Sequence, residues 1–217
     1  MIEKPLSGKK IAVIVENKFI PDEIEAYRNC FTLLGAQVDF ISRIWYGNSK
    51  PASVTFYSDV DPLDSPPWQS PQPLTVSIDV SSVNRWDYAA IIMCANYTSV
   101  RLRWDDIPVD FDPYNYVKQP PVVELFAEIM ADKRIVKGAL CHGLWILTPN
   151  PQLLKGRKVI CHSVIMADIL NCGAEIVLND AKVVTDEDLV TGFSKHEVLG
   201  FISAITEQII KIQKERS

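Results

Sequence analysis

The stretch KIAVIVENKFIPDEIEAYRNCFTLLGAQVDFI, residues 10–41, predicts the class of fold. Residues 10–16 form a near-continuous apolar run, which is typical of a strand buried on both faces of a parallel sheet. Pro21, Asp22 and Glu23 suit the first turn of a helix, and apolar residues then recur at helical spacing until Gly35. Residues 37–41 have the pattern of a second strand, so a strand–helix–strand unit is expected here.

The same alternation continues to the end of the chain. Further strands are expected over residues 74–78, 88–93, 135–140, 158–161, 174–178, 183–184 and 189–190, and helices from residue 121, after Gly143, over 164–171 and over 194–214. Ser194 and Glu197 have the spacing of a capping box at the start of the last helix. Two stretches, 46–73 and 96–119, break the alternation and are expected to be irregular insertions. The fold class is therefore α/β, with an open, mostly parallel sheet sandwiched by helices in a single domain over residues 1–217.

The composition is that of an ordinary globular protein, with 47% hydrophobic and 23% charged residues among 217. The net charge of −5, from 22 basic and 27 acidic residues, argues against a broad phosphate-binding surface, so no nucleic acid partner is expected. No apolar run approaches the roughly 18 residues of a membrane helix, and the first residues lack the pattern of a secretory signal. The five cysteines form no CxxC pair, which argues against a disulfide framework or a zinc ribbon. We expect a reduced, cytoplasmic protein without a membrane partner.

Three cysteines, Cys94, Cys141 and Cys161, lie at the ends of predicted strands, where sites form in open α/β sheets. Of these, Cys141 has the pattern of a nucleophile elbow, Ala139-Leu140-Cys141-His142-Gly143, because small residues flank it between a strand and a helix. A sharp turn strains the nucleophile's backbone and crowds its neighbours, so small residues leave the necessary room. The following helix N-terminus would lower the thiol pKa and stabilise an oxyanion. Alternatively, Cys141 is a small buried residue that fills a turn.

The elbow resembles the A-x-C-H-G sequence of the ThiJ/PfpI superfamily. That superfamily also has a glutamate 12 residues before the glycine that ends its first helix, which corresponds here to Glu23 before Gly35. Residues 153–159 (LLKGRKV) resemble the family's L-L-x-G-x-K-V, residues 156–162 match G-x-K-V-x-x-H, and residues 189–192 (LVTG) resemble its closing strand. The resemblance covers most of residues 9–45 and 86–213, and it implies a flavodoxin-like, class I glutamine amidotransferase-like fold with a nucleophile elbow.

The resemblance also implies roles. Cys141 would be the nucleophile, and Glu23 would hydrogen-bond its sulfur as a protonated carboxyl or serve as general acid and base. His142 would be the general base, with a partner carboxylate from another subunit, and His162 would lie near the pocket. No metal and no organic cofactor is implied, and a homo-oligomer, most often a dimer, is expected.

Several alternatives stay open at this point. Glu23 could serve only the helix dipole, and Glu16, at the end of the first predicted strand, is a rival carboxylate. His162 could be a satisfied polar residue at a strand end. His196, on the final helix, is expected to be structural or exposed.

One departure from the family concerns the oxyanion hole. The family carries a Pro-Gly-Gly turn after the strand over residues 88–93, whereas this chain continues Met93-Cys94-Ala95-Asn96 and has no glycine between Gly47 and Gly138. Residues with a Cβ resist positive φ, so the geometry of the hole is expected to differ. The expected oxyanion donors are the backbone N–H groups of Ala95 and His142. Cys94 would face the crevice of Cys141, and bridging would require Cα atoms within roughly 7 Å.

These patterns predict a cysteine-dependent hydrolase or glyoxalase-like lyase that acts on a small carbonyl or amide compound through a low-pKa Cys141 thiolate. The alternatives are a stress-response redox sensor, in which Cys141 is oxidised to a sulfinate, and a non-catalytic binding member of the same superfamily. The insertion at 46–73 is expected either to cover the pocket or to pack on a partner subunit. Candidate subunit contacts are the aromatic residues Tyr46, Trp68, Trp104 and Tyr114.

Overall fold

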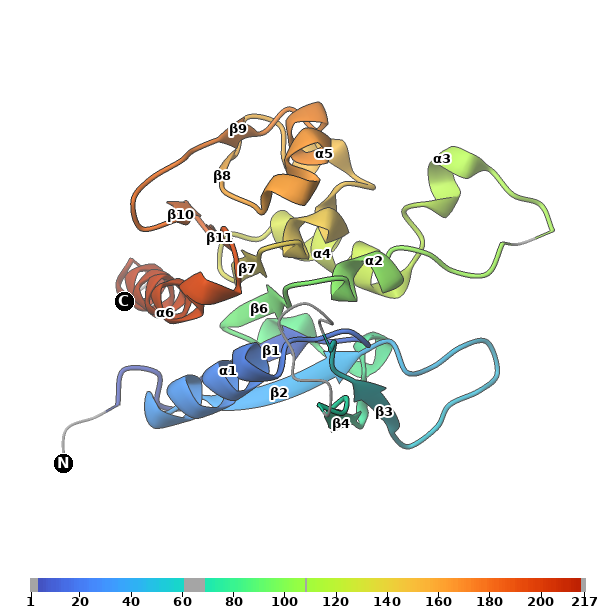
Figure 1. Ribbon diagram of the computed structural model, residues 1–217, viewed down its shortest axis with the longest axis horizontal. Coiled ribbons are helices and arrows are strands. Elements are labelled where there is room, and N and C mark those ends of the chain that lie inside the picture. Colours follow the sequence, from blue (N-terminus) through green and yellow to red (C-terminus); the bar gives the residue numbers. More distant parts are fainter. Residues whose placement is uncertain (1–3, 61–68, 108, 216–217) are drawn as a thin grey trace.

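A computed structural model describes residues 4–60, 69–107 and 109–215. Its central sheet has seven strands in the order β10-β11-β7-β6-β1-β2-β5 (Figure 1). In that order the strands are Val183–Asp186, Leu189–Gly192, Val136–Leu140, Ala90–Met93, Lys10–Ile14, Gln37–Ser42 and Ile78–Asp79. All neighbours are parallel except β10 and β11, which pair antiparallel at one edge. The expected open, mostly parallel α/β sheet is confirmed.

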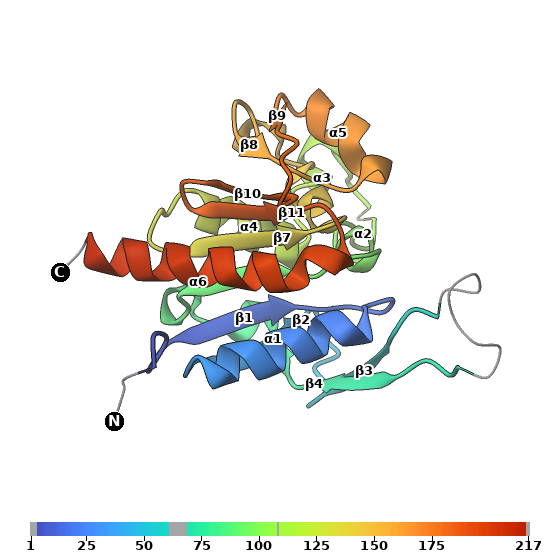
Figure 2. The same ribbon diagram turned by 60° about the vertical axis from the view of Figure 1, so that its left-hand side comes forward.

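Helices cover both faces of this sheet. Helices α1 (Pro21–Leu33) and α6 (Val198–Lys214) contact each other in front of it in Figure 2, and α4 (Pro121–Met130) lies behind. Every residue of β6 and β7 is buried, which is why these strands are apolar without alternation except at Lys137 of β7. Shorter helices are α2 (Thr98–Arg101), α3 (Pro113–Tyr116) and α5 (Met166–Asn171). Within the described residues, no helix is long and apolar enough to cross a bilayer.

Two predicted strands exist but lie outside the central sheet. Strands β8 (Lys158–Val159) and β9 (Glu175–Ile176) are short and pair in parallel with each other in a sheet of their own. The N–H of Ile160, just after β8, donates to the Thr191 hydroxyl at 2.9 Å instead of to a strand ladder. Cys161 therefore does not end a strand of the central sheet, as the sequence had suggested, because a side chain of β11, and not a strand ladder, satisfies this backbone.

The stretch 46–73 was expected to be irregular, and this is wrong for part of it. Strand β3 (Val54–Tyr57) pairs antiparallel with β4 (Pro73–Val76), and we call the described residues of this projection, 54–60 and 69–76, the hairpin arm (Figure 2). Phe56 and Val76 are its buried anchors. With a single buried residue in the four of β3, the pattern was too short to distinguish from a loop.

The aromatic residues expected at subunit contacts are on the surface. Tyr46, Trp104 and Tyr114 are exposed. Trp68 lies outside the described residues. The role of these residues in an interface stays a prediction.

Candidate active site

Cys141 follows β7 directly and has a strained backbone, with φ +58°. Its N–H donates to the carbonyl of Gly192 at 2.8 Å, which ties the turn to β11. A Cβ at Gly143 would lie 2.8 Å from the backbone oxygen of Met93, so only glycine fits there. The expected elbow is confirmed, although the segment after it, Gly143–Leu147, is a short 3₁₀ helix and not a long α-helix.

Cys141 is buried, with 8% of the residue's surface exposed. Its sulfur receives hydrogen bonds from two backbone N–H groups, those of Asn96 and His142. Burial nevertheless raises the pKa of the Cys141 thiol to about 11, and the nearby carboxyl of Glu23 adds to the rise. The expected low thiol pKa is therefore wrong for the resting protein, because loss of water around the sulfur outweighs the two amides. The thiol carries its proton at pH 7.

Glu23 lies in the first turn of α1 with only 1% of its surface exposed. Its two carboxyl oxygens accept from the N–H of Ala95 at 3.0 and 3.1 Å, and Oε1 also accepts from the Tyr27 hydroxyl at 2.8 Å. Burial raises the pKa of Glu23 to about 7, against the lowering effect of both donors. The carboxyl can therefore both hold and release a proton near neutral pH, which goes beyond a role in the helix dipole.

The Ala95 amide, expected in the oxyanion hole, is instead used to hold Glu23. The amide of the next residue, Asn96, faces the sulfur, because Asn96 adopts the left-handed conformation with φ +62°. Asparagine is among the few residues other than glycine that tolerate this region. Sequence reasoning missed Asn96 and Tyr27; the signals were an Asn in the glycine-free turn and a Tyr one helical turn after Glu23.

The two candidate histidines lie side by side. Nε2 of His142 is 3.3 Å from Nδ1 of His162, and the His142 ring packs against Tyr97 and Trp145 with centroids 5.3 and 5.4 Å apart. Burial, with a further effect of His162, lowers the pKa of His142 to about 4, so its imidazole is neutral at pH 7. Nδ1 of His162 also accepts from the N–H of Val164, which caps a 3₁₀ turn.

Three further residues that the sequence singled out are Glu16, Cys94 and Cys161. Oε1 of Glu16 accepts from Asn17 at 2.8 and 2.9 Å and from Arg101 at 3.3 Å, in a separate polar cluster that does not line the cavity described next. Cys94 is fully buried, and burial raises its thiol pKa well above the usual range. Burial, with a further effect of Cys141, raises the pKa of Cys161 to about 12. The approach of Cys94 to Cys141 within bridging distance stays a prediction.

A cavity of about 720 Å³ opens beside Cys141. Its lining comes from separate parts of the chain: the start of α1 with the residues before it, the hairpin arm, the turn after β6, the elbow, and the segments after β8, before β10 and before α6. The lining residues are Phe19, Ile20, Pro21, Asp22, Asp59, Gln69, Gln72, Asn96, Cys141, His162, Lys182, Phe193, Ser194, Lys195, His196 and Glu197. His196 is exposed, as expected, but it lies at this cavity.

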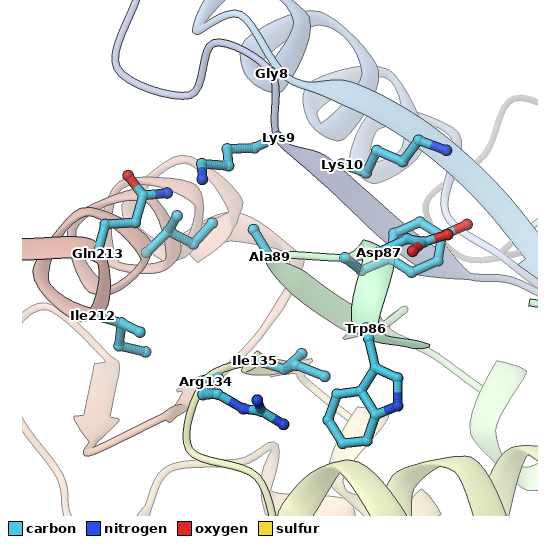
Figure 3. A pocket seen from close by; sticks show the side chains of 12 residues that line it. Gly8, Lys9, Lys10, Trp86, Asp87, Ala89, Arg134, Ile135, Ile212 and Gln213 are labelled. Carbon is cyan, nitrogen blue, oxygen red and sulfur yellow. The ribbon is translucent and has the colours of Figure 1, made fainter. Parts of the chain in front are cut away.

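A second cavity, of about 500 Å³, lies at the opposite end of the sheet (Figure 3). It is lined by residues at the amino ends of the strands and the last turns of α6, among them Lys9, Trp86, Arg134 and Ile212. No cysteine lines it, so the chemistry predicted from the elbow belongs to the first cavity. Within the described part of the chain, no three His, Cys, Asp or Glu side chains gather so as to hold a metal ion.

Known proteins resemble this chain in sequence and in fold. The model of the DJ-1/PfpI family matches residues 112–208. General stress protein 18 of Bacillus subtilis (strain 168) is 27% identical over 194 residues, which cover 89% of this chain and 94% of that protein.

Two solved structures share the fold at lower identity. A two-domain protein from Anabaena variabilis, with DJ-1/ThiJ/PfpI-like and ferritin-like domains, has a TM-score of 0.71 and 18% identity over 93% of this chain. The match covers 48% of that protein, so the chain spans about half its length. DJ-1beta of Drosophila melanogaster has a TM-score of 0.68 and 12% identity, over 96% of this chain and 97% of that one.

Proposed function

Since residues 112–208 match the DJ-1/PfpI family, we propose that the chain is a member of it and a cysteine-dependent hydrolase or glyoxalase-like lyase acting on a small carbonyl or amide compound through Cys141. The observation that carries the proposal is the placement of the sulfur. Cys141 lies on a strained turn at a cavity of about 720 Å³, and its sulfur accepts hydrogen bonds from two backbone N–H groups. The buried carboxyl of Glu23 is close enough to affect the thiol pKa. Strain, amides and a tunable carboxyl are the parts that nucleophilic catalysis needs.

The first step follows from the two raised pKa values. The Cys141 thiol, with a pKa of about 11, keeps its proton until an electrophile arrives, whereas Glu23, with a pKa of about 7, is partly ionised at pH 7. As sulfur bonds to the substrate's carbonyl carbon, the thiol proton passes to the Glu23 carboxylate. The carbonyl oxygen takes the electron pair, and the amides of Asn96 and His142 stabilise it.

The later steps depend on the substrate. From a dicarbonyl, the adduct is a hemithioacetal; Glu23 moves the proton from its carbon to the adjacent carbonyl carbon, and water cleaves the resulting thioester to give a 2-hydroxy acid. From an amide, the tetrahedral adduct expels an amine protonated by Glu23, and water cleaves the thioester. In both cases the net change is the addition of one water. A substrate small enough for the cavity and a homodimeric assembly are part of the proposal.

A redox-sensing role is the second candidate, and one observation favours it. The relative from Bacillus subtilis is named a general stress protein. In that role Cys141 would be oxidised by peroxide to a sulfinate, with no turnover of carbonyl or amide substrates. The raised pKa of the Cys141 thiol makes this oxidation slow at pH 7, because the thiolate is the reactive form.

The test measures turnover of methylglyoxal and of a chromogenic amide by the intact chain. Cys141→Ala is expected to abolish turnover, and Glu23→Gln to lower kcat by about 10²–10⁴ because proton transfer is lost. Cys30→Ala, which removes a half-buried thiol on the opposite part of α1, is the matched control and should keep full activity. Turnover that survives Cys141→Ala contradicts the proposal. A mass gain of two oxygens on Cys141 under mild peroxide, without turnover, would favour the sensor.

A further inference from the structure

The turn that presents an amide to the sulfur contains no glycine. Asn96 nevertheless holds φ +62° there, a conformation that costs energy for any residue with a Cβ. Such a conformation persists only where surrounding contacts over-determine it. The contacts of the Asn96 side chain therefore matter to the chemistry of Cys141.

The side-chain amide of Asn96 makes two hydrogen bonds to parts of the chain distant in sequence. Nδ2 donates to the backbone oxygen of Lys18 at 2.8 Å and to Oδ2 of Asp59 at 2.9 Å. An amide group has two N–H donors, so both are used. With its side chain fixed in this direction, the Asn96 backbone cannot rotate freely, and its N–H stays directed at Cys141.

The two partners of Asn96 are fixed in turn. Nζ of Lys18 contacts Oδ1 of Asp59 at 3.0 Å, and the N–H of Lys18 donates to the carbonyl of Tyr57 at 2.8 Å. The N–H of Asp59 donates to the carbonyl of Phe19 at 2.9 Å. Although burial raises it, the bonds from Asn96 and Lys18 lower the pKa of Asp59 overall, so Asp59 is a carboxylate at neutral pH.

We propose that Lys18, Asp59 and Asn96 form a clamp that aligns the Asn96 amide with the Cys141 sulfur, in place of the conformational freedom that glycine would give this turn. In the clamp, Asp59 is a positioning residue that the hairpin arm contributes to the active site, and it acts through Asn96. The proposal rests on the proposed function, because it assigns the clamp to the oxyanion hole of that reaction. It also gives the arm a task other than subunit contact.

The test uses the alkylation rate of Cys141 by iodoacetamide at pH 8, followed by mass spectrometry of the labelled peptide, so it needs no turnover. Below the thiol pKa, the rate falls tenfold for each unit by which that pKa rises. Asp59→Ala releases the Asn96 side chain and weakens the amide's hold on the thiolate, so the rate should fall about tenfold, the effect of one charge-assisted hydrogen bond. Asp59→Asn keeps an acceptor for Asn96 and should restore most of the rate.

The direction of the change separates the clamp from simple electrostatics. Removing a negative charge from the cavity, or opening access to it, would by itself raise the rate. Asp22→Ala, which removes a carboxylate at the same cavity, is the matched control and should raise it. A double-mutant cycle then tests the route through Asn96. Asn96→Gly keeps the left-handed turn without a side chain, so adding Asp59→Ala to it should change the rate less than twofold.

Two outcomes would overturn the clamp. One is an unchanged or raised rate in Asp59→Ala, and the other is an equal fall in the presence and absence of Asn96→Gly. Unfolding is recognised separately, because it would also label the buried Cys94 and Cys161. If no substrate is turned over while the labelling rates behave as stated, the proposed function fails and the clamp stands.

Discussion

At the scale of single residues, burial raises the pKa values of two groups in the site, the Glu23 carboxyl and the Cys141 thiol. The pKa values of Glu23 and Cys141 rise to about 7 and about 11, because each loses water and because the Cys141 thiol also faces the negative charge of Glu23. At pH 7 the Cys141 thiol is protonated and Glu23 is partly ionised, so the negative charge of the pair resides on Glu23. Catalysis would then begin with a transfer of the thiol proton and not with a preformed thiolate.

The buried carboxyl has a consequence for stability. Between pH 4.5 and about 7 the folded protein keeps a proton on Glu23 that the unfolded chain releases, so the free energy of unfolding falls as pH rises through this window. The rise in pKa corresponds to about 3 kcal/mol, fully present below pH 4.5 and lost above pH 7. In Glu23→Gln this dependence should disappear.

Urea denaturation of both proteins from pH 4 to pH 8 measures the effect. The difference in unfolding free energy between Glu23→Gln and the original chain should shift by about 3 kcal/mol in favour of the variant as pH rises. His142, whose lowered pKa acts in the opposite direction, is present in both proteins and cancels. A difference that stays constant with pH would argue against a proton on the buried carboxyl.

At the scale of elements, α6 approaches the sheet where β7 carries a glycine. A Cβ on Gly138 would lie 2.8 Å from Cζ of Phe201 and 2.9 Å from Cδ1 of Ile205, both on α6. Glycine in a buried strand marks such a close approach. Since β7 leads directly into Cys141, the seating of α6 on this strand also sets the position of the elbow.

Gly138→Ala is therefore expected to destabilise the protein by about 1–3 kcal/mol, through overpacking against Phe201 and Ile205. Gly200, on the outer side of α6, is the matched control, because the nearest atom to a Cβ there is Cγ2 of Val183 at 3.6 Å. Gly200→Ala should stabilise the helix by about 1 kcal/mol. Thermal and chemical denaturation of the two variants would show the opposite signs, and equal signs would contradict this account of the helix–strand contact.

At the scale of the whole molecule, a buried ionic network joins the central sheet to the two-stranded sheet of β8 and β9. Lys137 on β7 is fully buried and contacts Asp188, between β10 and β11, and the carbonyl of Asp132 at 2.6 Å. Arg157, just before β8, bonds Asp188 at 2.9 Å and Asp186 at 2.6 Å. The antiparallel edge and the β8–β9 sheet are thereby tied to a strand that ends at Cys141.

Asp188→Ala would leave Lys137 buried without its carboxylate, which should lower the free energy of unfolding by about 3–5 kcal/mol. The matched control is Lys133→Ala, which breaks an exposed pair with Glu187 in the same region and should cost far less, because solvent screens that pair. Denaturant titrations of both variants compare the two losses. Similar small losses would mean that the network does not hold the β8–β9 sheet to the core.

The sequence alone determined those features that depend on neighbouring residues. Apolar runs predicted β1, β6 and β7, and the Ser194–Glu197 capping box is present as expected. The elbow followed from small residues beside Cys141, because a sharp turn is a local steric demand. The prediction of an irregular stretch over residues 46–73 missed β3, because the four residues of this strand carry too little pattern.

Only the tertiary structure decided the chemistry around the sulfur. The amide of Ala95 meets Glu23 across 72 residues of sequence, and Asn96 meets Lys18 across 78. No local pattern contains such contacts, because chain folding creates them when the carboxyl ends of β1, β6 and β7 meet at one edge. The thiol pKa follows the same logic: several distant segments together exclude water from the sulfur, and this desolvation outweighs the amides of Asn96 and His142.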